Sequence, residues 1–168
     1  MARRALSTVL LSGLILFALI QLVPYRVENP PVRQEPVWDS PQTRELAQRA
    51  CFDCHSNEVR VPWYGQVAPV AWIVRDHVDE ARSELNFSEM DRPQREAHEA
   101  GEEVAEGEMP PWYYTPMHPE AQLTEAQWST LAAGLDATLG TEEGHAGRAS
   151  GSDRPQHSDQ RLDDEDSD

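Results

Sequence analysis

Residues 51–55 read Cys51-Phe52-Asp53-Cys54-His55, a C-x-x-C-H pattern that uses both cysteines of this 168-residue chain. The spacing is the attachment signature of c-type haem. Two thiols three residues apart at a helix end can add to the two vinyl groups of one porphyrin, and His55 can then offer a neutral imidazole nitrogen to the iron. The pattern therefore predicts one haem c, bound covalently through Cys51 and Cys54.

Two other chemistries use the same residue types. A C-x-x-C pair can form a disulfide or a thioredoxin-like redox centre. Such a pair is expected next to a βαβ unit, whereas the sequence around this motif favours helices. A structural zinc site needs a fourth ligand, which only the fold could supply, from His77 or His98. We therefore favour haem.

The composition excludes several classes of function. The chain has 14 arginines, no lysine and 30 acidic residues, a net charge of −16. So acidic a chain is a poor ligand for nucleic-acid phosphates. Hydrophobic residues make up only 39%, which indicates that part of the chain does not pack into a core.

Residues 1–23 have the composition of a membrane anchor. Arg3 and Arg4 precede an uncharged run from Ala5 to Val23, about 28 Å long as a helix and enough to cross a bilayer core. A cleaved signal peptide is the alternative, but the run is longer than a usual signal core, and no A-x-A-like site precedes Pro24. We expect an uncleaved anchor in the inner membrane, with the remainder of the chain on the exported, periplasmic side.

Three segments follow the anchor. Residues 24–39 are rich in proline and predict an extended spacer that holds the domain off the membrane. Residues 40–140 are the expected haem-binding domain. Residues 141–168 are acidic and almost free of apolar residues, which predicts a disordered tail.

Four helices are predicted in the domain, at 40–50, 67–85, 93–107 and 124–139, and no stretch alternates like a strand. Ser40 and Thr124 are the expected N-caps of the first and the last. The fold class is therefore all-α, a small cytochrome-c-like helical domain around one covalent haem, preceded by a single transmembrane helix.

Two of these helices have a distinctive face. The apolar face of the second comprises Val67, Val70, Ala71, Val74, Val78, Ala81 and Leu85. The third carries a stripe of small residues, Ala97, Ala100, Gly101 and Val104. Small side chains allow that helix a close approach to a neighbouring helix or to a flat ligand.

Met109 is the first candidate for the second axial ligand of the iron. It follows Gly107 and precedes two prolines, which favour a stiff, extended loop that can hold a thioether over a porphyrin. The alternative for Met109 is packing in the core. The further candidates, in falling order, are Met117 and His118, then His77, His98 and Met90. We expect His77 to be a core histidine, and His118 can instead hydrogen-bond the backbone or a propionate.

The aromatic residues of the domain are expected in the core and in the wall of the haem site. They are Trp63, Tyr64, Trp72, Trp112, Tyr113 and Tyr114.

Several stretches resemble the bacterial haem-binding domain family. They are the motif with Ser56-Asn57-Glu58, Val61-Pro62-Trp63-Tyr64, Val67 to Trp72, Leu85-Asn86-Phe87-Ser88, Met109-Pro110-Pro111 and His118 to Ala121. The resemblance covers about residues 40–135 and implies an exported, membrane-anchored monohaem c-type cytochrome. By that likeness Cys51 and Cys54 attach haem, His55 ligates iron and Met109 occupies the place of the distal ligand. Met90 departs from the family, where a tryptophan is expected.

The predicted function is single-electron transfer rather than enzyme catalysis, because two protein ligands leave no open position on the iron. The alternative is a haem-based sensor or peroxidase-like protein with an open or labile distal site. A third possibility is that haem serves only as a structural staple for a module that recruits a membrane partner. The glutamates within 96–108 predict a docking face for a basic redox partner, or else a solvated helix surface.

Overall fold

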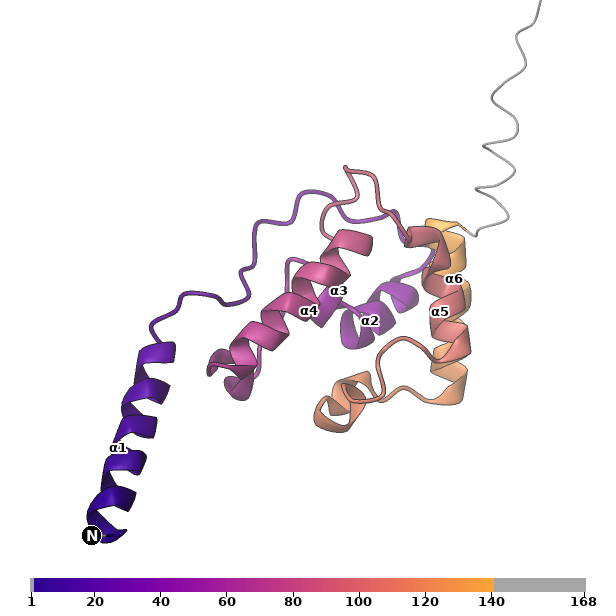
Figure 1. The fold of residues 1–168 in the computed structure, drawn as a ribbon. Coiled ribbons are helices and arrows are strands. Elements are labelled where there is room, and N and C mark those ends of the chain that lie inside the picture. The colour runs from indigo at the N-terminus through magenta and orange to yellow at the C-terminus, as the bar shows by residue number, and fades with distance from the viewer. Residues whose placement is uncertain (1, 141–168) are drawn as a thin grey trace, which may run out of the picture.

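The computed structural model describes residues 2–140 as helices and connecting loops, with no strand in that part of the chain. The α-helices are α1 (Ala2–Ile20), α2 (Pro41–Ala50), α3 (Phe52–His55), α4 (Val70–Glu84), α5 (Ala100–Glu106) and α6 (Glu125–Leu139). Short 3-10 turns are η1 (Trp63–Gln66), η2 (Ala97–Glu99), η3 (Thr115–Met117) and η4 (Pro119–Ala121). The all-α prediction is confirmed (Figure 1). The predicted acidic tail, residues 141–168, lies outside the described residues.

Side-chain oxygens fix the starts of two predicted helices. The hydroxyl of Ser40 accepts a hydrogen bond from the N–H of Thr43 at 3.1 Å, ahead of α2. Thr124 and Gln127 form the expected capping box ahead of α6. Each oxygen satisfies an N–H group that has no partner inside its helix, so both helices begin where the caps predict.

The second predicted helix starts later than expected. α4 begins at Val70, because Val67 has extended backbone and Ala68 precedes Pro69, which disfavours helical backbone at Ala68. Val67 and Val70 are exposed, whereas Ala71 and Val78 are buried. The predicted apolar face is therefore correct from Ala71 onward and wrong for Val67 and Val70.

The third predicted helix is shorter than 93–107. The N–H groups of Arg95 and Glu96 both donate to the carbonyl of Glu84, and the side chain of Gln94 accepts from the N–H of Asn86. These residues hydrogen-bond to the C-terminal end of α4 instead of starting a helix. The α-helix of this region therefore begins only at Ala100.

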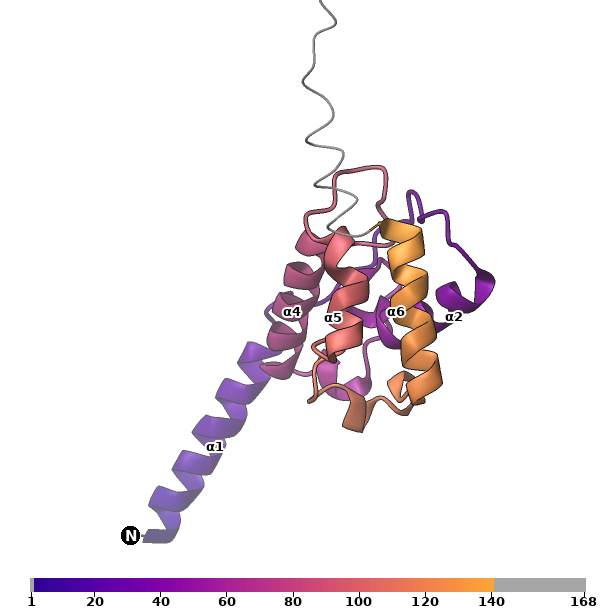
Figure 2. The same ribbon diagram turned by 90° about the vertical axis from the view of Figure 1, so that its right-hand side faces the viewer.

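The stripe of small residues faces a helix. α5 and α6 lie side by side (Figure 2), and a Cβ added at Gly101 would lie 2.9 Å from the carbonyl oxygen of Ala132 on α6. The side chain of Asp136 is closer still. Of the two predicted neighbours for this stripe, the structure therefore shows the helix.

The core is centred on an aromatic group that includes the motif itself. The rings of Phe52 and Phe87 stack at 5.5 Å between centroids, and Trp38 lies 5.2 Å from Phe87. Leu131 and Leu135 of α6 are fully buried in the same cluster. Because Phe52 lies between the two cysteines, the core holds the motif in place from within.

The segment between α1 and α2 contains no helix, and it is bonded to the domain along its length. Asn29 exchanges two hydrogen bonds with the backbone of Val59, and the N–H groups of Arg33 and Gln34 donate to the carbonyl of Ser88. These bonds make the segment part of the folded unit. It is not a free linker.

Candidate functional site

The motif forms one helical turn at the end of α2. The N–H of Cys51 donates to the carbonyl of Ala47 at 2.8 Å, which is the last hydrogen bond of α2. The carbonyl of Cys51 then accepts from the N–H groups of Cys54 at 3.1 Å and His55 at 2.9 Å. Both thiols are free and partly buried. The two sulfur-bearing residues and the imidazole are thus held in a single turn.

The ring of His55 has a fixed orientation. Its Nδ1 lies 3.1 Å from the carbonyl oxygen of Leu85, which can only accept a hydrogen bond, so Nδ1 carries the proton. Burial lowers the pKa of His55, while the carbonyls of Leu85 and Ala81 raise it. The ring is therefore neutral, and Nε2 is the nitrogen with its lone pair available to a metal.

A buried polar clasp supports that orientation. The N–H of Phe87 donates to the carbonyl of His55 at 2.8 Å. The side chain of Asn86 donates to Asn57, and the hydroxyl of Ser88 accepts from the N–H of Asn57. Asn57, Asn86 and Ser88 are all buried, so each needs a hydrogen-bond partner, and these bonds supply it.

The alternative cysteine chemistries lack support. Burial raises the pKa of Cys51 to about 12 and that of Cys54 to about 11. Thioredoxin-like cysteines have lowered pKa values instead. In the part of the chain that the structure describes, one group of three side chains is close enough to bind a metal ion together. It consists of Asp53, His118 and Glu120 and contains neither cysteine.

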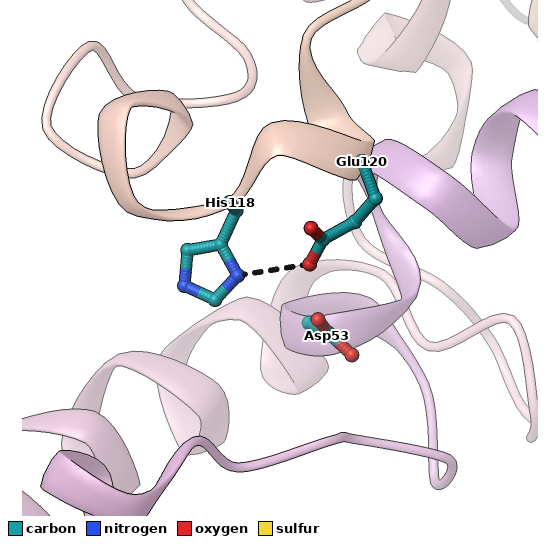
Figure 3. A group of neighbouring side chains, drawn as sticks. All are labelled: Asp53, His118 and Glu120. Carbon is teal, nitrogen blue, oxygen red and sulfur yellow. Dashed lines mark hydrogen bonds and ion pairs between the residues drawn. The ribbon is translucent and has the colours of Figure 1, made fainter.

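Asp53 of the motif lies close to His118 and Glu120, which form an ion pair with each other (Figure 3). The hydroxyl of Tyr114 donates to Asp53 at 3.0 Å, and the N–H of Arg60 donates to the other oxygen of the same carboxylate. Burial and the charge of Asp53 raise the pKa of Tyr114, which keeps its hydroxyl protonated. These bonds account for the cluster without a cation.

Both ring nitrogens of His118 lie within hydrogen-bond distance of a side chain. Nε2 lies 3.2 Å from the hydroxyl of Tyr64, and Nδ1 lies 3.2 Å from Glu120. The ring also stacks on Tyr114 at 3.8 Å between centroids. This arrangement disfavours His118 as an iron ligand and explains it as a structural residue.

Met109 follows α5 after a left-handed Gly107. Its N–H donates to the carbonyl of Glu103 at 3.1 Å, and its side chain is 38% exposed. It lines an open hollow that also includes Trp112 and Trp128. Packing of Met109 in the buried core, the alternative for this residue, is not what the structure shows, and its ligand role stays a prediction.

The other candidate ligands lie in varied settings. Met117 is exposed in η3, and Met90 packs against the core. His77 is exposed on α4 with its ring 6.1 Å from that of Tyr113, so its expected core position is wrong. His98 is half-buried in η2 beside Glu99.

The expected core position is also wrong for two aromatic residues. Trp63 and Trp112 are 79% and 84% exposed. Each precedes a tyrosine whose ring it meets edge-on, Tyr64 and Tyr113 respectively.

Comparison with known proteins identifies a family. The family model described as haem-binding domain matches residues 15–137. That range contains the motif, the Asn86–Ser88 clasp and Met109. No curated protein and no solved structure matches the chain.

Proposed function

This chain belongs to the haem-binding domain family, and on that premise we propose that it is a membrane-anchored, exported monohaem c-type cytochrome that transfers single electrons. Cys51 and Cys54 attach the haem covalently, and His55 ligates its iron. The residues fit the group, since both thiols are free and one imidazole nitrogen is available. When bound, the haem supplies a one-electron iron couple.

The observation that carries the proposal is the bond between His55 and Leu85. An iron-ligating histidine usually donates its second ring N–H to a carbonyl or carboxylate, which fixes the tautomer and the ring plane. His55 has this arrangement one residue after Cys54. The thioethers and the imidazole would therefore act on the same porphyrin from a single helical turn.

The chain's own residues have positioning roles. Phe52 anchors the motif in the core, and Asn57, Asn86 and Ser88 hold the loop that carries the Leu85 carbonyl. A fixed ligand set reduces reorganisation when the iron changes its charge. The proposed role is electron transfer, so no residue is assigned to substrate catalysis.

Met109 is the proposed distal ligand, and its thioether would raise the potential of the iron. One observation favours the rival function, a sensor or peroxidase-like protein: Met109 is part of an open hollow with Trp112 and Trp128. Carbon monoxide separates the two. A closed His/Met site binds it slowly after reduction, and an open site binds it at once.

The proposed location rests on α1. This helix has 19 residues, a mean hydropathy of 1.7 and no buried residue, which are the properties of a membrane span. A signal sequence has the same properties. We propose an inner-membrane anchor with the domain on the periplasmic side.

A basic redox partner is proposed to dock on the acidic surface of residues 96–108. The pKa of Glu103 is raised by burial first and then by the negative charges of Glu108 and Glu99. A concentrated negative field attracts a basic partner, so the association rate is expected to fall as salt rises.

The test is whether haem remains attached after denaturation. Full-length protein from an export-competent host should retain its haem through acid–acetone extraction and denaturing electrophoresis. Cys51→Ala and Cys54→Ala should each leave one thioether and shift the pyridine haemochrome band. His55→Ala should lose the proximal ligand, while His77→Ala, a matched exposed histidine, should change nothing. Haem that is extracted from the unaltered protein contradicts covalent attachment.

A further inference from the structure

The end of α1 is bonded directly to the domain. The side-chain amide of Gln21 donates to the carbonyl of Ala68 at 3.1 Å, and its oxygen accepts from the N–H of Ala68 at 2.9 Å. Arg26 donates to the carbonyl of Gln66, and Arg75 donates to the carbonyl of Arg26. These bonds therefore hold the backbone around Ala68 next to the end of α1.

This attachment changes the prediction made for residues 24–39. An extended spacer without contacts would let the domain stand away from a membrane. Here the chain is bonded to the domain from Gln21 onward, and α1 points away from the domain in both views (Figures 1 and 2). If α1 spans a bilayer, the end of the domain that bears Ala68 lies at the bilayer surface.

The chain segments at that end carry exposed apolar side chains. We call them the anchor-side face: Trp63, Val67, Val70, Trp112, Tyr113 and Met117. The two segments that supply them are joined by the bond from the hydroxyl of Tyr64 to Nε2 of His118. Both views show η1 and the turns at 115–121 at the end of the domain from which α1 leaves (Figures 1 and 2).

The composition of this face fits one partner. Trp63 is 79%, Trp112 84% and Met117 62% exposed, unusually open for such large side chains. Tryptophan and tyrosine are enriched where a protein meets the interfacial region of a bilayer. An acidic domain is not attracted to anionic headgroups. The proposed attraction to the bilayer therefore comes from the apolar side chains.

We propose that the anchor-side face rests on the lipid bilayer, with Trp63 and Trp112 inserted among the headgroups beside α1. This inference rests on the proposed role of α1 as an anchor. The haem-bearing domain is then held flat against the membrane, which restricts the orientations in which a partner can reach it.

Photolabelling from lipid tests the proposal. Full-length haem-loaded protein is placed in nanodiscs of phosphatidylcholine that contain a diazirine-bearing phosphatidylcholine, and labelled peptides are mapped by mass spectrometry. Peptides covering 61–73 and 109–117 should carry label well above background, in addition to α1. Val37 is the matched control, because it is an apolar side chain 92% exposed on the segment before α2. Its peptide should stay at background.

The variant Trp63→Ser with Trp112→Ser should reduce labelling of both peptides several-fold and leave α1 labelling unchanged. Label confined to α1 overturns the docking but agrees with α1 as an anchor. Equal label on the Val37 peptide also overturns the docking. Label absent from α1, with protein released from the discs, overturns the anchor itself. If 61–73 and 109–117 are labelled only after haem is lost, the haem covers this face and the docking is wrong.

Discussion

The hydroxyl of Tyr114 lies 3.0 Å from the carboxylate of Asp53 and donates a hydrogen bond to it. Asp53 is inside the C-x-x-C-H motif, and Tyr114 is five residues after Met109 in the chain. This bond joins the segment of the proposed distal ligand to the helical turn of the proximal one. The side chain of Asp53 is only 11% exposed, so water cannot easily replace the tyrosine as donor.

Replacing Tyr114 with Phe should therefore weaken both the fold and the proposed distal ligation. Loss of a donor to a buried charged acceptor costs about 1–3 kcal/mol. Denaturant unfolding should show that loss, and the ferric methionine–iron charge-transfer band should weaken because the Met109 segment is held less firmly. Tyr113→Phe, at a half-exposed neighbour, is the control. Equal behaviour of the two variants contradicts a specific role for the Tyr114–Asp53 bond.

Replacing Met109 with Ala should remove the ferric charge-transfer band and lower the reduction potential, because a weaker ligand or water takes the sixth position. Carbon monoxide should then bind the reduced protein rapidly. Met117→Ala, at the exposed methionine of η3, should leave the spectrum unchanged. An unchanged spectrum in Met109→Ala rejects Met109 as the ligand and favours the open-site alternative.

Much of this arrangement follows from local sequence signals. Ser40 and Thr124 cap helices within a few residues of themselves, and the motif defines its own turn. The clasp formed by Asn57 and Asn86 could not be predicted in the same way, because its partners are 29 residues apart and meet only after α4 has folded back. The exposure of Trp63 and Trp112 cannot be predicted from sequence, because large aromatic side chains are on average mostly buried in folded proteins.

The spacing of helices depends on contacts of the same long-range kind. A Cβ added at Gly134 would lie 2.1 Å from Oγ1 of Thr43, so α2 and α6 touch where only glycine fits. Gly134→Ala should destabilise the fold by about 1–3 kcal/mol through overpacking. Thr43→Ala should relieve part of that loss in the double variant. Strict additivity of the two changes in thermal unfolding argues against a direct contact.

The acidic surface gives an effect of pH on stability. Burial and then Glu108 and Glu99 raise the pKa of Glu103 in the folded protein above its ordinary value. The folded state therefore binds this proton more tightly than the unfolded state does. The stabilising contribution is present below the unfolded pKa and is lost as pH rises through the raised folded pKa.

Glu103→Gln should accordingly raise stability at neutral pH by about 0.5 kcal/mol, the size of a like-charge repulsion one helical turn apart. The gain should shrink below the ordinary carboxyl pKa and also at high salt, where the repulsion is screened. Urea unfolding at several pH values and two salt concentrations measures both dependences. Glu125→Gln, in the first turn of α6, is the control and should lose a favourable interaction with the helix N-terminus instead. A gain for Glu103→Gln that ignores both pH and salt would show that the acidic residues do not repel one another.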